Sequence, residues 1–229
     1  MAVDTSEYWF FDYFDILESL SDDEKLKVMD MSCRTKWAKK SIIYNDGDSA
    51  DRLYFLKSGS VKVSKYSSEG KEMIMSIFKK GDVFGEASII NVFDGKHNEV
   101  VEVLEDVLTC SLSIKDVKNL LDINLEFSKS ILQLIGERHD KVQKRLEALF
   151  FKTTPERIKG FIKDYALEYG KKLVFSDEIE VKFSLTHDDI AKLTGTTRQT
   201  VTSIFNKLQK SNIIDYDRTR ILVRDINQL

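Results

Sequence analysis

The segment HDDIAKLTGTTRQTVTSIFNKL, residues 187–208, is the feature that most constrains the fold of this chain. Ile190, Ala191 and Leu193 indicate one short helix, and the glycine at 195 allows a sharp turn after it. Small Ala191 lets a second helix approach closely. The apolar residues of that second helix have offsets of 0, 3, 4 and 7, which is one helical face: Val201, Ile204, Phe205 and Leu208. The pattern predicts a helix-turn-helix.

The opposite face of the second helix is polar and has no carboxylate. It carries Gln199, Thr202, Ser203, Asn206 and Lys210, with Arg198 at its flank. Such a face suits a helix that reads base edges in the major groove of DNA. Downstream, NIIDYDRTRILVRD at 212–225 predicts two short strands, a wing from which Arg218 and Arg220 reach DNA phosphates.

Residues 41–113 have a different texture. Short runs rich in Val, Ile, Tyr, Phe and Met alternate with turn glycines spaced by 12, 11 and 11 residues: Gly47, Gly59, Gly70 and Gly81. Within residues 61–64 and 108–113, apolar and polar side chains alternate, as they do along a β-strand. This rhythm is typical of successive antiparallel strands and predicts a small β-barrel or β-roll.

One long helix is predicted over residues 116–151. Apolar side chains recur every three or four positions along much of it, with Arg138 filling a gap: Leu120, Phe127, Ile131, Leu134, Val142 and Leu149. Such a stripe needs a partner, so we expect two copies to associate through a parallel coiled coil. The alternative is that the helix packs back on its own barrel.

Two further helix starts are visible. Ser21 and Glu24 form a capping box ahead of a short apolar run. Thr153-Thr154-Pro155-Glu156 places a hydroxyl cap, a proline and an acid at the start of a helix that ends at the glycine at 170. Residues 152–154 are therefore predicted to be a hinge between two domains.

Composition excludes several classes of protein. Cys33 and Cys110 are the two cysteines of a 229-residue chain, too few for a disulfide framework, a zinc site or a four-cysteine cluster. No signal peptide or membrane span is evident, so we expect a cytoplasmic protein without membrane contact. The net charge is −3, but residues 152–229 hold 14 Lys and Arg against 11 Asp and Glu, so the cationic part is C-terminal.

The order of roll, long helix, hinge and winged helix-turn-helix resembles the Crp/Fnr transcription regulators. The resemblance rests on GDVFGE at 81–86, RHDKVQKRLEALFF at 138–151 and LTHDDIAKLTGTTRQTV at 185–201. It implies an α+β fold: an N-terminal antiparallel β-roll of the jelly-roll type (1–117), a dimerisation helix and hinge (118–152), and a winged helix-turn-helix (153–229). It also implies a bacterial regulator without enzymatic activity. Its partners would be a second copy, a two-fold symmetric DNA operator and RNA polymerase.

The resemblance also suggests which residues meet DNA. Cyclic-AMP-responsive members read their half-site with Arg-Glu and a later Arg; here Arg198 matches the first, whereas Gln199 and Ser203 replace the others. The operator should therefore differ from the half-site of those members. Alternatively, Gln199 is a capping partner of Thr196. The candidate DNA contacts are Thr197, Arg198, Gln199, Thr202, Ser203, Asn206, Arg218 and Arg220.

The effector is harder to predict. Cyclic-nucleotide binders of the family use a glutamate, matched by Glu86, and an Arg-Ser pair, replaced here by Lys96 and His97. Lysine lacks the bidentate fork of arginine, so cyclic AMP is disfavoured. The retained Arg138 serves either a ligand or an ion pair with Glu86. The candidate pocket comprises Gly85, Glu86, Lys96, His97, Arg138, Val142 and Gln143, the last two standing where the family has Thr-Ser.

No cofactor or metal is expected, because the iron–sulfur members need four cysteines and haem or cupin-type sites need more suitable histidines than this chain offers. An unknown small-molecule effector remains open. So do two alternatives: a cyclic-nucleotide-responsive regulator with a degenerate phosphate cassette, and a nucleotide-sensing module that does not bind DNA.

Overall fold

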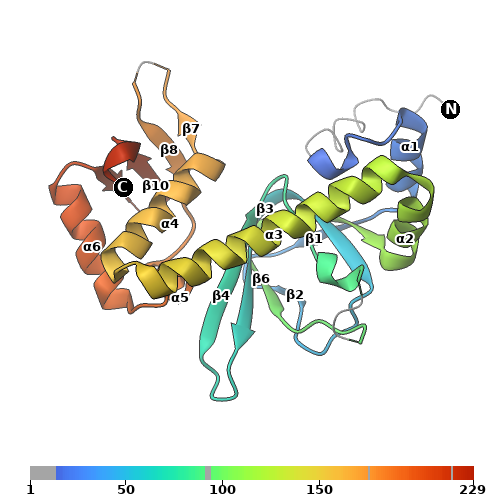
Figure 1. The fold of residues 1–229 in the computed structure, drawn as a ribbon, viewed down its shortest axis with the longest axis horizontal. Coiled ribbons are helices and arrows are strands. Elements are labelled where there is room, and N and C mark those ends of the chain that lie inside the picture. Colours follow the sequence, from blue (N-terminus) through green and yellow to red (C-terminus); the bar gives the residue numbers. More distant parts are fainter. Residues whose placement is uncertain (1–13, 91–93, 175, 218) are drawn as a thin grey trace. The chain divides into compact units, whose positions relative to one another are not determined.

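The computed structural model describes residues 14–90, 94–174, 176–217 and 219–229 (Figure 1). Contacts between residues divide the chain into two units. The first comprises Met1–Lys71 and Met75–Lys141, and the second comprises Glu72–Ile74 and Val142–Leu229. No helix of the described ranges is long and apolar enough to cross a membrane.

Strands β1 to β6 form one sheet with the order β1-β6-β3-β4, in which β2 also pairs with β6 and β5 with β3. The bounds are Cys33–Trp37 (β1), Ile42–Tyr44 (β2), Arg52–Tyr66 (β3), Glu72–Lys79 (β4), Val83–Phe84 (β5) and Val100–Ser113 (β6). The pairs β1–β6, β2–β6, β3–β5 and β3–β6 are antiparallel. The antiparallel roll predicted from the glycine rhythm is confirmed.

Both faces of the long strands β3 and β6 are buried. Phe55 and Leu112 belong to one apolar cluster, whereas Val61 and Val103 belong to another. The alternation predicted for the strands therefore does not separate core from solvent. Polar residues that alternate with the apolar ones are buried as well and have partners: Lys62 pairs with Glu102 at 2.9 Å, Thr109 accepts a hydrogen bond from Trp37, and Ser111 accepts one from Arg52.

Gly59 was predicted to end a strand, and this prediction is wrong. Strand β3 continues through it, and the pairing with β6 shifts register on both sides, between Leu56 and Ser58 and between Ser58 and Ser60. Gly59 has φ of 81°, and a Cβ there would clash with the carbonyl oxygen of Asp106. A left-handed glycine within a strand is typical of a β-bulge, which bends the strand without ending it.

Helix α1 (Asp22–Met31) begins at Ser21, whose predicted capping box with Glu24 is confirmed. The single long helix predicted for 116–151 is wrong, because α2 (Ile114–Ile123) and α3 (Leu125–Phe151) are separated at Asn124. Asn124 has an extended backbone, and its side-chain oxygen accepts a hydrogen bond from the Phe127 amide at 2.9 Å. An asparagine that caps a helix start in this way competes with continuous helix.

Helix α3 has two apolar faces rather than the single stripe predicted. Phe127 and Ile131 are buried in the core of the roll, as the alternative proposed. By contrast, Val142 and Leu149 are 55% and 45% exposed and are not part of this core. The sequence pattern merged residues from two neighbouring faces, because spacings of three and four fit both.

The second unit contains α4 (Thr154–Tyr169), β7 (Lys171–Lys172), β8 (Ile179–Lys182), α5 (His187–Thr194), α6 (Arg198–Lys210), β9 (Ile214–Tyr216) and β10 (Arg220–Val223). Its strands form a sheet with the order β7-β8-β10-β9. Thr153 caps α4 through Glu156, and Gly170 follows its last residue, both as predicted. The helix-turn-helix and the wing formed by β9 and β10 are likewise confirmed.

Candidate nucleic-acid interface and roll pocket

The start of α6 is set by local hydrogen bonds. Gly195 adopts a left-handed conformation, with φ of 65°, and ends α5. The Thr197 side chain then caps α6 by accepting a hydrogen bond from the Thr200 amide at 3.2 Å. The alternative in which Gln199 caps the helix with Thr196 is therefore wrong, because the cap lies one residue later. Gln199 lies in the first turn of α6 and is exposed.

The outer face of α6 is available for contact. Arg198, Gln199, Ser203 and Asn206 are exposed, and Thr202 is half-buried. The inner face is buried and consists of Val201, Ile204, Phe205 and Leu208. Burial of the apolar stripe against the rest of the second unit thus orients the polar candidates outward.

Two of these candidates are held from behind by residues of other elements. Thr202 Oγ1 lies 2.8 Å from Nδ1 of His187 on α5. The Asn206 side-chain oxygen accepts a hydrogen bond of 3.1 Å from the Tyr216 hydroxyl on β9. Neither His187 nor Tyr216 was a candidate from the sequence, because neither contact has a signal in residue spacing.

Arg157 of α4 was also missed. Its guanidinium donates to the carbonyl oxygens of Thr194 and Gly195 at 2.9 and 3.2 Å, and to that of Lys152 at 3.0 Å. These carbonyls lie at the end of α5 and at the hinge. One side chain therefore joins the turn of the helix-turn-helix to the start of α4. The sequence could not reveal this role, because a single arginine that faces a turn leaves no recognisable pattern of residue spacing.

The wing presents less free positive charge than the sequence suggested. Arg220 forms ion pairs with Glu180 at 2.8 Å and with Asp217 at 3.3 Å. Arg218 lies outside the described residues. By contrast, Arg198 has no ion pair among the described residues.

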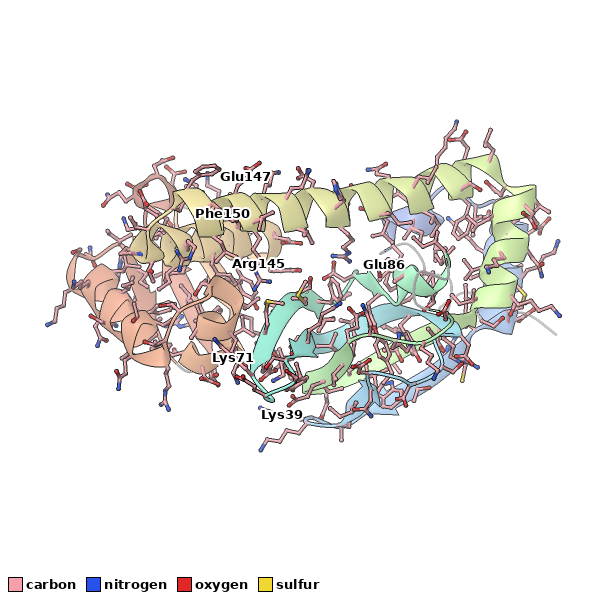
Figure 2. The ribbon with its side chains drawn as sticks, turned by 60° about the horizontal axis from the view of Figure 1, so that its bottom comes forward. Lys39, Lys71, Glu86, Arg145, Glu147 and Phe150 are labelled. Atoms are coloured by element: carbon pink, nitrogen blue, oxygen red, sulfur yellow. The ribbon has the colours of Figure 1, made fainter. Side chains whose placement is uncertain are left out.

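In the roll, Glu86 begins the short turn that follows β5 and is labelled in Figure 2. The preceding Gly85 has φ of 86°, and a Cβ on it would lie 2.8 Å from the Arg52 carbonyl oxygen. Glu86 faces Arg138 of α3, with Oε1 and Nε 3.6 Å apart. Arg138 also donates to the Val83 carbonyl oxygen at 2.9 Å and lies 4.1 Å above the Phe78 ring. The arginine is thus engaged by the protein itself.

His97 and Lys96, which stand where an anion clamp is expected, diverge. His97 is buried and stacks on Tyr44, with ring centroids 3.5 Å apart and planes at 6°. Lys96 is exposed. The Tyr44 hydroxyl donates to Glu99 at 3.0 Å, which brings a second carboxylate to the group. The sequence assigned no role to Tyr44. Its contacts with His97 and Glu99 appear only in the folded structure, in which β2 pairs with β6.

The remaining pocket candidates, Val142 and Gln143, belong to the second unit and are exposed. The structure therefore brings together Gly85, Glu86 and Arg138, and separately stacks His97 on Tyr44. Phe84 adjoins both groups: its ring centroid lies 6.3 Å from that of Tyr44 and 6.1 Å from that of Phe78, the ring below Arg138.

Burial raises the pKa of Glu86 above its usual value, although the positive charge of Arg138 opposes this. Burial also raises the pKa of Glu99, against the hydrogen bond from Tyr44, and the charge of Glu86 raises it further. Burial lowers the pKa of His97, against the nearby charges of Asp48 and Asp51. Whenever these two carboxyl groups are ionised they repel an anion, and Arg138, which could attract one, already contacts Glu86 and the Val83 carbonyl oxygen.

Glu86→Gln is expected to stabilise the roll at neutral pH relative to the wild type. The raised pKa means that folded Glu86 binds a proton more tightly than unfolded Glu86, so its ionisation costs stability above the folded pKa. This cost disappears as pH falls toward the ordinary glutamate value of about 4.3. Denaturant unfolding between neutral pH and pH 5 should show the difference between variant and wild type shrinking. Glu69→Gln, at an exposed turn, is the control; a constant difference would contradict the prediction.

The comparisons with known proteins agree with this architecture. Residues 34–124 match the family described as "Cyclic nucleotide-binding domain", and residues 156–229 match "Crp-like helix-turn-helix domain". The chain belongs to the Crp/Fnr family of transcription regulators. Since a Crp-like reading domain accompanies the roll, a nucleotide-sensing module that does not bind DNA is not favoured.

Two relatives of this Crp/Fnr regulator have similar sequences but different names. A "Global nitrogen regulator" from Nostoc sp. is 28% identical over 187 residues, which cover 81% of this chain and 82% of the relative. A "CRP-like cAMP-activated global transcriptional regulator" from Mycobacterium tuberculosis is 25% identical over 187 residues and covers 82% of each chain.

Solved structures share the fold. FixK2 from Bradyrhizobium japonicum superposes with a TM-score of 0.75 at 19% identity, over 86% of this chain and 94% of its own. A CooA mutant from Carboxydothermus hydrogenoformans gives a TM-score of 0.72 at 23% identity, over 88% of each chain. Among the described residues of this regulator, no cluster of three or more His, Cys, Asp or Glu could hold a metal ion.

Proposed function

We propose that this regulator binds a two-fold symmetric DNA operator as a homodimer, through α6, and is controlled by its roll. The observation that carries this is the outer face of α6, which carries amides, hydroxyls and an arginine without an ion pair in the described part of the chain, but no carboxylate. Residues 1–117 are assigned to the sensor, 118–152 to dimerisation and the hinge, and 153–229 to DNA binding. The protein acts in the bacterial cytoplasm, where RNA polymerase is its further partner, and catalyses no reaction.

Electrophoretic retardation with genomic fragments tests the proposal. Binding should weaken steeply between about 50 and 200 mM salt, because each phosphate contact releases a counterion. Absence of retardation at every salt concentration would sink the proposal.

Base readout is assigned to the first turn of α6. Arg198 can donate two hydrogen bonds to guanine O6 and N7, and Gln199 suits adenine N6 and N7 rather than the cytosine amine that a glutamate accepts. The exposure of both residues supports this assignment.

Arg198→Ala is expected to weaken operator binding by about 1–3 kcal/mol and to relax one position of each half-site. The measurement is selection of binding sequences from random duplexes, followed by affinity titration. Lys171→Ala, an exposed lysine on β7 of the same unit, is the control and should keep the wild-type profile. An unchanged profile for the Arg198 variant would remove this residue from base readout.

Dimerisation is assigned to the second face of α3. Its positions alternate in steps of three and four residues, as in a coiled-coil seam: Leu132, Ile135, His139, Val142, Leu146 and Leu149. Leu132 and Leu146 are 69% and 55% exposed, so most of the seam is not covered within one copy, although Ile135 packs partly against the core of the roll. A dimer of this kind places its reading helices on half-sites about 34–36 Å apart.

The effector of the roll is proposed not to be cyclic AMP. An anionic ligand would meet Glu86 and Glu99, while Arg138 is already bound to protein groups and Lys96 is exposed. Calorimetric titration with cyclic AMP should show no saturable binding. Saturable binding that Glu86→Gln or Lys96→Ala abolishes would establish the alternative, a cyclic-nucleotide-responsive regulator.

A further inference from the structure

The histidine at the start of α5 is linked to α6 through a chain of hydrogen bonds. His187 Nδ1 lies 2.8 Å from Thr202 Oγ1, and the Thr202 hydroxyl donates to the Arg198 carbonyl oxygen at 3.0 Å. A hydroxyl has one proton to donate, so a Thr202 hydroxyl that donates to the Arg198 carbonyl oxygen can only accept from the imidazole. In that arrangement Nδ1 of His187 carries a hydrogen, and Nε2 is the nitrogen that gains or loses a proton.

The imidazole is fixed by rings from two other elements. Its centroid lies 4.9 Å from that of Phe205 on α6 and 5.7 Å from that of Tyr216 on β9. Phe205 is fully buried, and Tyr216 holds Asn206. His187 and Tyr216 thus form one layer behind the outer face of α6, from which they hold two of its candidate DNA contacts.

The charges around the imidazole oppose its protonation in the free protein. Burial lowers the pKa of His187, and the positive charge of Arg198 on α6 lowers it further. The other titratable group packed against it is the Tyr216 phenol of β9. On α5 itself, Asp188 pairs with Lys192 at 2.6 Å and Asp189 accepts hydrogen bonds from Thr186. DNA would reverse this balance, because phosphates that approach Arg198 favour a second positive charge beside it.

We propose that His187 is a proton-linked phosphate contact that also positions Thr202. Nδ1–H holds Thr202 on the reading helix, and Nε2 takes up one proton from solvent when a DNA phosphate approaches. The inference rests on the operator binding proposed above. Protonated His187 would be a cation that exists only in the complex with DNA. It would add positive charge to a unit in which the wing residue Arg220 is already paired with carboxylates.

The consequence is an operator affinity that depends on pH. Between pH 8 and pH 6 the affinity should rise as pH falls, by at most about tenfold per pH unit for each protomer. At pH 6 the dependence of log affinity on log salt should be steeper than at pH 8 by at most about 0.9 for each protomer, since one more phosphate is neutralised. A histidine that served only to position Thr202 would change neither slope.

Two variants separate the positioning role from the titrating role. His187→Asn keeps an amide near the place of Nδ1 and can still hold Thr202, whereas His187→Gln places an amide near Nε2; neither side chain titrates. Affinity for a duplex selected by the wild type is measured from pH 6 to 8 at two salt concentrations. The Asn variant should bind at pH 8, the Gln variant should bind more weakly than it at every pH because Thr202 is no longer held, and both should lose the rise toward pH 6.

Proton NMR supplies a second readout. The pKa of His187 should rise when the duplex is added, while that of His97, buried in the roll, serves as the internal reference. If the variants retain the wild-type pH profile, or if the pKa of His187 does not rise on binding, the inference is overturned while operator binding stands. If the wild type selects no duplex at any pH, operator binding falls, and this inference falls with it.

Discussion

Leu146→Asp is expected to convert the dimer to a monomer and to abolish tight operator binding. Leu146 lies in the C-terminal half of the exposed seam of α3 and is 55% exposed in one copy. In a symmetric parallel coil the same position of each copy meets its counterpart, so the substitution places two carboxylates side by side at the interface. An uncompensated charge buried in this way costs about 3–5 kcal/mol. At about 1.4 kcal/mol per tenfold, the dissociation constant of the dimer should rise at least 100-fold.

The measurement is sedimentation equilibrium, together with affinity for duplexes that carry one or two half-sites. Phe151→Asp is a matched control, because Phe151 is also an exposed apolar residue of α3, at 85%, but lies off the seam. It introduces the same charge and should remain dimeric. If Leu146→Asp is also dimeric at the wild-type protein concentration, α3 does not form the interface through this face.

Phe205→Ala is expected to destabilise the second unit by about 3–5 kcal/mol. Phe205 is fully buried between α5, α6 and β9, where its ring meets those of His187 and Tyr216 at centroid distances of 4.9 and 5.1 Å. Its removal leaves a cavity and loosens the imidazole that holds Thr202. Since whole domains are stable by only about 5–15 kcal/mol, this is a large share of the total.

Hydrogen exchange resolved by segment should detect the loss. Residues 154–229 are expected to exchange faster, while β3 and β6 of the roll keep their protection, because the two units have separate cores. Phe151→Ala removes an equally large but exposed ring and should change stability by no more than about 0.5 kcal/mol. Equal protection of α6 in the Phe205 variant and the wild type would contradict the prediction.

Local signals in the sequence located most of the elements but not all of their limits. The cap at Ser21, the cap at Thr153 and the break at Gly195 are interactions among residues close in the chain, and each is found where it was predicted. Gly59 and Asn124 were misjudged. A glycine can end a strand or bulge it, and an asparagine can sit within a helix or cap the next one. The neighbouring strand or helix decides between these outcomes.

The candidate DNA contacts could be proposed from residue type and helical spacing, since the apolar face of α6 dictates which residues remain outside. The supports behind them could not. His187 and Thr202 are 15 residues apart, and Arg157 reaches carbonyls 37 and 38 residues away. In the roll, the ion pair of Glu86 with Arg138 was one of two alternatives that the sequence left open, whereas the contact of Tyr44 with Glu99 appears only in the folded structure.

By itself, the sequence determined the order of roll, long helix, hinge and winged helix-turn-helix, because helical period, strand alternation and capping depend on residues near one another in the chain. Only the tertiary structure decided how α3 divides its apolar residues between its own core and an open seam, and which charges face one another in the roll. Spacings of three and four residues fit two adjacent faces of a helix equally well. Charge compensation depends on distances between elements, which the order of residues does not encode directly.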